Sequence, residues 1–244
     1  MKKSIKFFLS HLVISLLIAL FVIVLVFFVW YPVPLVKAVG VAQIFVTLIA
    51  IDVIIGPVLG FVIYKEGKKT LKFDLAIIIF IQLSALCYGV YSIAQGRPIW
   101  LVYNIDRFEL IRNNELIQKN IQQAQSSYQQ PSWFKPQFVA AQFSKDVKQY
   151  NSDMYAEVFS GISIAQRPER YVPLTQVGQQ MQQRAQSLKV LEQFNDKAEV
   201  KKELAKYPQA DAWVPLKANA VDMVVLLKKD TAEVIKIVDL RPWK

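Results

Sequence analysis

One carboxylate lies where carboxylates are rarely found. Asp52 is the only charged residue of the 24-residue run Val41–Tyr64, about twelve residues from its start. A charged side chain at the centre of a bilayer costs about 2.5–3.5 kcal/mol on insertion scales, so it becomes protonated or pairs with a partner. Its chemistry would be that of a proton or ion site, or of a hydrogen-bonded contact between helices.

The surrounding residues favour the contact over the ion site. A proton pathway normally needs several titratable groups, and no other charged residue lies in any apolar run. Gly56 and Pro57 follow Asp52 at i+4 and i+5, where a helix can kink or approach a partner closely. Counting equal depths on antiparallel helices predicts Ser84 and Tyr88 as neighbours of Asp52. We interpret Asp52, Gly56 and Pro57 as candidates for a structural or partner contact.

Other catalytic chemistry is disfavoured by the residue types present. The one histidine, His11, and the one cysteine, Cys87, both precede residue 96, which excludes zinc sites and Cys/His or Ser/His catalysis from the rest of the chain. Five of the eight glycines precede residue 90, and none forms a phosphate-binding loop. The pair Glu199 and Glu203 lies in a lysine-rich stretch typical of solvated helices. The sequence therefore predicts no catalytic, cofactor-binding or metal-binding residue, and no enzyme.

The composition is too apolar for a soluble protein and too charged for a wholly embedded one. Hydrophobic residues make up 54% of the 244 residues and the mean hydropathy is +0.28, whereas soluble domains contain about 45–50% apolar residues. Residues 1–95 hold 11 charged side chains and residues 96–244 hold 37. Each part has a net charge of +5, so the total of +10 does not indicate one face that binds nucleic acid.

Three apolar runs predict transmembrane helices at about 11–31, 41–64 and 74–95. The first run is too long for a signal peptide and ends in aromatic residues, so we expect it to be retained. Seven lysines lie before the first helix and in the loop after the second, whereas the loop after the first has only Lys37. The positive-inside rule puts the N-terminus in the cytoplasm and residues after 95 outside, in the periplasm of a Gram-negative cell.

We expect residues 1–95 to form a three-helix transmembrane bundle and residues 96–244 to form an α+β periplasmic domain. Strand-like sequence covers 99–105 and continues over 106–111, and three further strands are expected at 213–217, 221–227 and 233–240. Helices are expected at 115–130, 146–160, 175–188 and 194–206. We expect the first strand to pair with the three strands near the end of the chain.

Six blocks of residues occur in a recognisable order along nearly the whole chain. They are Asp52–Pro57, Gly67–Asp74, Gly96–Val102, Asp106–Glu109, Ile164–Pro168 and Val238–Trp243. No single block is specific, but the six in sequence resemble the type IV pilin accessory proteins of the TfpX/TfpZ family. Glu66-Gly67 departs from the Pro-Gly turn expected in that family, which affects only a loop.

The resemblance implies a chaperone-like inner-membrane protein of fimbrium biogenesis that is not an enzyme. Such a protein assists or modulates the assembly or surface display of a cognate type IV pilin, the major pilin subunit. Its membrane spans would meet the helix of pilin and its outer domain the globular head. The resemblance also implies other pilus-assembly proteins and membrane lipid as partners, and it brings no cofactor.

Four charged residues next to the third predicted span have two interpretations. Arg97, Asp106, Arg107 and Glu109 are candidates for a juxtamembrane partner surface. The alternative is an ion pair of Arg97 or Arg107 that fixes the first strand against the bundle.

Two other functions fit the sequence less well than the accessory protein. An ion-coupled transporter or channel component built around Asp52 would need further polar groups in the membrane and usually inverted repeats. A membrane-anchored periplasmic enzyme would need a nucleophile–base pair or a metal site, which the sequence after residue 95 lacks.

Overall fold

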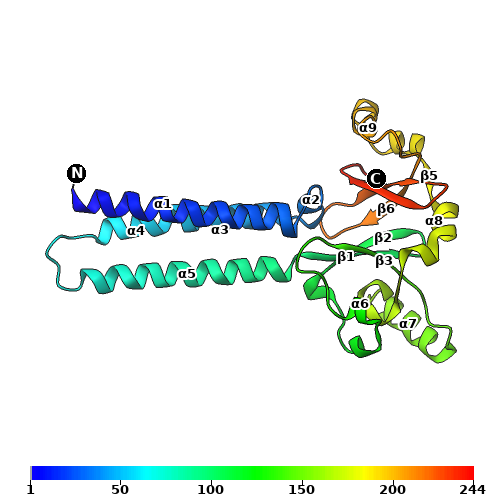
Figure 1. Cartoon of the computed structure of the whole chain (residues 1–244), viewed down its shortest axis with the longest axis horizontal. Coiled ribbons are helices and arrows are strands. Elements are labelled where there is room, and N and C mark those ends of the chain that lie inside the picture. The colour runs from blue at the N-terminus through cyan, green and yellow to red at the C-terminus, as the bar shows by residue number, and fades with distance from the viewer. Residues whose placement is uncertain (1) are drawn as a thin grey trace. The chain divides into compact units, whose positions relative to one another are not determined.

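The computed structural model describes residues 2–244, which form two compact units (Figure 1). The helix unit contains the residues up to Tyr31 and Val41–Gly96. The sheet unit contains Arg97–Lys244 and also Pro32–Gly40, the loop that follows the first long helix. The chain therefore passes between the two units at three positions along the sequence.

Three helices in residues 2–244 are long and apolar enough to cross a membrane: Lys3–Trp30, Ala42–Ile63 and Leu71–Gln95. The first consists of α1 (Lys3–Val24) and a π-helical turn, η1 (Leu25–Trp30). The second consists of α3 (Ala42–Ala50), a π-helical turn, η2 (Ile51–Ile55), and α4 (Gly56–Ile63), and the third is α5 (Leu71–Gln95). The three apolar helices predicted from the sequence are confirmed, although the first begins earlier than expected.

The helix unit is held together largely by apolar and aromatic packing. The rings of Phe27 and Phe45 meet edge to face with their centres 5.1 Å apart, which joins the first helix to the second. Tyr31 donates a hydrogen bond of 2.7 Å to the carbonyl of Ile93. Large side chains such as Phe21 and Phe80 are about 70% exposed on the outside of the unit. A helix unit that is apolar both inside and outside is typical of a lipid environment.

In the described part of the chain, the sheet unit contains one eight-stranded sheet (Figure 1). The order is β4-β3-β1-β2-β6-β7-β8, and β5 pairs with β6. The strands are β1 (Pro98–Asn104), β2 (Arg107–Arg112), β3 (Gln137–Ala141), β4 (Tyr171–Val172), β5 (Gln186–Ser187), β6 (Ala212–Lys217), β7 (Met223–Lys228) and β8 (Glu233–Val238). The strand-like stretch expected at 99–111 forms two antiparallel strands, β1 and β2, and the three strands expected after residue 212 are confirmed.

The pairing of the first strand differs from our expectation. β1 lies between β2 and β3, and β2 rather than β1 pairs with β6, in parallel. The prediction had no strand at Gln137–Ala141, because this short segment follows Pro131 and Pro136 in a polar stretch without clear alternation. β3 therefore takes the place beside β1 that we assigned to the later strands.

The predicted helix at 115–130 is wrong. The segment forms two 3₁₀ turns, η3 (Asn113–Glu115) and η4 (Ile121–Gln123), and the short helix α6 (Ser126–Gln129). Glu115 folds back to accept hydrogen bonds from the backbone N–H and the guanidinium of Arg112, which holds a tight turn at the start. Ala124 and Tyr128 are buried against the sheet. Side-chain hydrogen bonding and packing therefore override the helical periodicity.

The other helices of the sheet unit lie close to the predicted positions. They are α7 (Val147–Ser160), α8 (Gly178–Arg184) and α9 (Lys197–Leu204). The helix expected at 175–188 is shorter, because Gln186 and Ser187 pair with Trp213 and Ala212 as β5. Asp146 caps α7 by accepting a hydrogen bond of 2.9 Å from the N–H of Gln149.

The loop Pro32–Gly40, which we call the docked loop, belongs to the core of the sheet unit. It contains the short helix α2 (Leu35–Val39), in which Leu35 is 3% exposed and Ala38 is fully buried. The carbonyl of Ala38 accepts hydrogen bonds from the N–H groups of Ala220 and Val221 at 2.9 and 3.2 Å. Gly40 ends the helix with φ +77°, and a Cβ there would lie 2.8 Å from the Cβ of Ala220. The docked loop therefore groups with Arg97–Lys244 in one compact unit.

Candidate functional site

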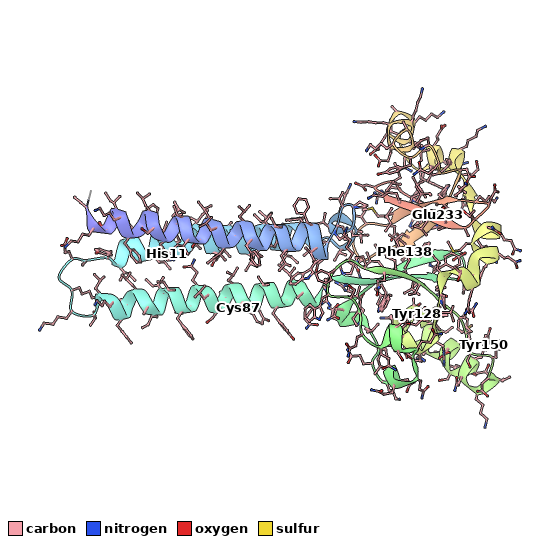
Figure 2. All side chains as sticks on the ribbon, viewed as in Figure 1. His11, Cys87, Tyr128, Phe138, Tyr150 and Glu233 are labelled. Carbon is pink, nitrogen blue, oxygen red and sulfur yellow. The ribbon has the colours of Figure 1, made fainter. Side chains whose placement is uncertain are left out.

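Three polar side chains, of His11, Ser15 and Gln82, meet the backbone carbonyl of Asp52 inside the helix unit, and we call these four residues the Gln82 cluster. The Oε1 atom of Gln82 on α5 lies 3.0 Å from Nε2 of His11. His11, which is labelled in Figure 2, lies on α1. The Nε2 atom of Gln82 donates hydrogen bonds to Ser15 Oγ at 3.1 Å and to the carbonyl oxygen of Asp52 at 2.9 Å. Ser15 and Asp52 are 2% and 5% exposed. One neutral amide therefore joins all three long helices through hydrogen bonds.

The local structure of the second helix positions Asp52 and makes room for Gln82. Asp52 lies in the π-helical turn η2, a kind of turn that is frequent at functional sites. Gly56 is buried one turn later, and a Cβ placed on it would lie 2.0 Å from Gln82 Oε1. Pro57, directly after Gly56, is also buried. The close approach of the Gln82 amide to this helix thus depends on Gly56.

The predicted neighbours of Asp52 are wrong, since Gln82 takes the place assigned to Ser84 and Tyr88. Both of those residues are exposed on α5, Tyr88 to 74%. Counting depth fixes a level along the helix but leaves its rotation undetermined. The sequence did place Gln82 in the third apolar run, but only the packed structure aims it at Asp52.

Two apolar cavities lie on either side of the Gln82 cluster. One, of about 180 Å³, is lined by Asp52, Gly56 and Gln82 together with aliphatic residues of the second and third helices. The other, of about 270 Å³, is lined by His11, Ser15, Asp52 and Gln82 with residues of the first helix. A carboxyl group between apolar walls can exchange hydrogen bonds with a polar group that enters with an apolar partner. Asp52 and Gln82 thus line both cavities.

Replacing Gly56 by alanine should displace the Gln82 side chain and lower stability by about 1–3 kcal/mol, the usual cost of overpacking. Thermal unfolding of the full chain in detergent would measure this loss. The control is Gln82→Ala and the double variant G56A/Q82A. Because the smaller side chain leaves room for the new methyl group, the double variant should be no less stable than Gln82→Ala alone. Additive losses would contradict the close approach.

Three of the candidate residues in the sheet unit meet at the turn between β1 and β2. The Nη1 atom of Arg107 lies 3.7 Å from Oδ1 of Asp106, and its Nε lies 3.9 Å from Oε1 of Glu109. Glu109 is 7% exposed and accepts a hydrogen bond of 2.9 Å from Asn104 Nδ2. Burial, and then the nearby charge of Glu109, raise the pKa of Glu157 on α7. The Arg107–Glu109 ion pair that the sequence suggested is thus present, and it lies within the β1–β2 hairpin.

Arg97 lies at the opposite end of β1 from this turn. It is 4% exposed, and its guanidinium carbon lies 4.7 Å from the centre of the Trp133 ring. This is a cation–π contact. The structure therefore separates Arg97 from Asp106, Arg107 and Glu109, which the sequence analysis considered together.

The sequence analysis missed a buried ion cluster around Asp153. Asp153 on α7 is 1% exposed, and its two carboxylate oxygens lie 2.6 Å from Arg167 Nη1 and from Arg170 Nε. Arg167 belongs to the block Ile164–Pro168, which suggested its importance without showing its partner. An aspartate in a polar helix normally faces solvent, so no sequence signal marked this one as buried.

The block Val238–Trp243 fastens the docked loop to the sheet. Asp239 accepts a hydrogen bond of 2.6 Å from Nζ of Lys37 in the docked loop. Arg241 donates to the carboxylate of Asp239 and to the carbonyl of Asp222, and Trp243 Nε1 donates to Asp222 Oδ2 at 2.8 Å. The residues of this block therefore have structural roles in the sheet unit.

Comparison with known proteins decides the family. Residues 1–40 match the model of the fimbrial assembly protein FimB. The fimbrial assembly protein of serogroups C1 and C2 from Dichelobacter nodosus is 36% identical over 116 residues, which cover 47% of this chain and 88% of the relative. The chain belongs to the family of fimbrial assembly proteins. The recognition of a pilus accessory protein from the six sequence blocks is thereby confirmed at the level of the family.

Two longer relatives in the family are also similar. The fimbrial assembly proteins of serogroups I and E1 from Dichelobacter nodosus are each 33% identical over 164 residues, or 66% of this chain. The matched part spans 63% of the length of each of these relatives. No solved structure matches the chain.

Proposed function

We propose that this protein is a non-catalytic accessory protein, anchored in the membrane, that assists or modulates the assembly or surface display of a type IV pilin. The observation that carries the proposal is the match to a fimbrial assembly protein over 88% of that relative's length. The architecture supports it, because three apolar helices and a sheet unit provide surfaces for both parts of a membrane-anchored fimbrial subunit.

The distribution of lysines supports an inner-membrane location with the N-terminus in the cytoplasm. Lysines cluster before the first helix and between the second and third, on the ends that this orientation puts inside. The sheet unit then lies in the periplasm. Alkaline phosphatase fused after residue 244 tests this placement, because the enzyme is active only outside the cytoplasm; an inactive fusion would reverse the orientation.

In this proposal the Gln82 cluster is the contact in the membrane, and Asp52 is its reactive member. Hydrogen bonds between helices in a membrane contribute about 0.6–2 kcal/mol each, enough to select one partner helix over another. Asp52 lines both cavities that flank the cluster, so a polar group of a docked helix can reach it from either side. In the sheet unit, the turn at Asp106–Glu109 is the candidate contact for the globular part of the subunit.

Deletion of the gene, with and without complementation, tests the function. We expect the deletion to reduce surface fimbriae, and we expect the subunit to crosslink to this protein in the complemented strain. Subunit abundance should be measured in parallel, since it separates an effect on subunit stability from an effect on assembly. Unchanged fimbriae together with no crosslink would refute the proposal.

Substitution of Asp52 tests the contact in the membrane. We expect Asp52→Leu to lower surface fimbriae about tenfold, the effect of losing one hydrogen bond of about 1.4 kcal/mol. Asp52→Asn retains a polar amide and should have a smaller effect. Gln43→Leu is the matched control, because Gln43 is an exposed polar residue of the same helix. Normal fimbriae in both Asp52 variants, at normal protein levels, would remove Asp52 from the contact.

A further inference from the structure

A groove of about 240 Å³ lies in the sheet unit, and we call it the edge groove. Its walls come from the docked loop, from β1 and β3 and from β8. The lining residues are Pro32, Val33, Pro34, Leu35, Leu101, Lys135, Pro136, Phe138 and Val234–Ile237. The groove is larger than an apolar cavity of about 150 Å³ that holds benzene, so apolar side chains can enter it.

The groove follows the edge of β8 rather than one face of the sheet. Successive side chains of a strand point to opposite faces, yet four consecutive residues, Val234–Ile237, line the groove. In residues 2–244, β8 pairs only with β7 and ends the order of strands. Its outer edge therefore presents backbone N–H and C=O groups that no strand of the described chain pairs with.

A second free strand edge lies across the groove. β3 pairs with β1 over Gln137–Ala140 but reaches β4 only through Ala140 and Ala141, which leaves the outer side of Gln137–Val139 unpaired. Four strands separate β3 from β8 in the sheet order, yet Phe138 and Ile237 contribute to one hydrophobic core. The sheet therefore curls, and the edge groove is the gap between its two free edges.

The residues around the gap cannot complete the sheet by themselves. Pro32, Pro34 and Pro136 line it, and proline has no N–H to donate to the free carbonyls of β8. The charged residues of the lining are Lys135 and Lys236, and neither forms an ion pair with any residue between 2 and 244. A ligand of the edge groove would therefore need backbone groups that pair with β8, apolar side chains for the floor and negative charges for the two lysines.

We propose that the edge groove binds an extended peptide segment of a partner protein, with alternating apolar and acidic residues, as an added strand beside β8. The backbone of the segment pairs with the free edge, its apolar side chains fill the groove and its carboxylates meet Lys135 and Lys236. The inference goes beyond the proposed function, because peptide binding by the sheet unit does not depend on which protein supplies the segment.

Protection against aggregation gives the competing explanation of Lys236. Lysine on a free edge prevents strands of other molecules from pairing with it. If Lys236 only protects the edge of β8 against pairing, no peptide should bind there. Pairing of β8 with β8 of a second copy is a further alternative, and it predicts dimers without any peptide.

The test uses the full chain in nanodiscs and the acetylated, amidated peptide TVEVEVEVT. Affinity is measured by fluorescence anisotropy, and amide hydrogen exchange of residues 233–238 reports where the peptide lies. Two further peptides are N-methylated at every valine or at every glutamate, because each blocks the hydrogen bonds along one edge of the added strand. We expect slower exchange in β8 and loss of affinity for at least one methylated peptide.

Charge reversal supplies the matched variants. The double variant K135E/K236E should bind TVEVEVEVT about tenfold more weakly and should bind the lysine peptide TVKVKVKVT better than the wild type does. The control K119E/K148E reverses two exposed lysines outside the groove and should change affinity less than twofold. Recovery with the lysine peptide also shows that K135E/K236E is folded.

Three results would overturn the proposal. The first is no binding of TVEVEVEVT, and the second is binding that neither methylation nor charge reversal alters. The third is protection of β8 that depends on protein concentration without peptide, since that result assigns the edge to a second copy. Each of these outcomes leaves the proposed function standing, because that function is tested by deletion and crosslinking in cells.

Discussion

Replacing Asp153 by alanine is expected to destabilise the sheet unit by about 3–5 kcal/mol, the cost of leaving buried charges without their partner. Arg167 and Arg170 are only 15% and 12% exposed in their side chains, and both depend on this carboxylate. Among residues 147–160 of α7, Asp153 is the one that is buried, while Tyr155 and Phe159 are 65% and 77% exposed. Ion pairs rather than apolar packing therefore hold α7 on the sheet unit.

Denaturant titration of the full chain in detergent measures this effect through tryptophan fluorescence. Four of the five tryptophans lie in the sheet unit, so their signal follows its unfolding. The matched control is Asp230→Asn, because Asp230 is an exposed aspartate whose carboxylate forms no ion pair within residues 2–244. A shift no larger than that of the control would show that α7 does not depend on Asp153.

Replacing Leu35 by alanine is expected to cost the sheet unit about 2–5 kcal/mol, the usual range for a buried leucine. Leu35 comes from the loop between two long apolar helices, yet it packs in the same core as Leu101, Phe108 and Val225. A loop that merely connected two helices would tolerate this change within about 0.5 kcal/mol. The same fluorescence titration distinguishes the two cases.

The docked loop contains its own control. Val33 lies two residues before Leu35 and is 73% exposed. Val33→Ala removes apolar atoms from the same loop without opening a buried cavity, so we expect a change below about 0.5 kcal/mol. Equal effects of the two substitutions would mean that the loop does not dock in the core.

Patterns along the chain predicted the long elements well. Apolar runs of about twenty residues or more typically form one long helix, and the three long helices agree with this rule. The strands before residue 112 and after residue 212 are rich in branched and aromatic residues, and their burial against the core agrees with that bias. The helix expected at 146–160 forms as α7, and Asp146 caps it by accepting a hydrogen bond at its first turn.

Contacts between distant segments were not predictable from these patterns. Even the local outcome at Glu115 was hidden, because its capping box with Arg112 normally begins a helix, yet Leu116 is already extended and the turn stops there. The partner of Asp52 depends on how α5 is rotated, which no count of residues supplies. Asp153 has two arginine partners 14 and 17 residues away, and polar periodicity alone gives no sign of them.

The candidate sites show the same division. Asp52 and Gly56 were found from the sequence because a carboxylate and a glycine are conspicuous in an apolar run. His11, Ser15 and Gln82 were each too ordinary to be singled out, and only the packed helices join them to Asp52. The edge groove is built from prolines and aliphatic residues of four separate segments, so it has no signature in the sequence at all.

The docked loop can complete its contacts only late in the synthesis of the chain. The loop is synthesised early, yet the hydrogen bond of Lys37 cannot form until Asp239 has been translated, 202 residues later. Until then the apolar side of Leu35 has no completed sheet to cover it, and closing so long a stretch of chain costs entropy before any contact repays it. A chain truncated before β8 would lack both Asp239 and Ile237, which belongs to the same core as Leu35, so its docked loop would stay incompletely covered.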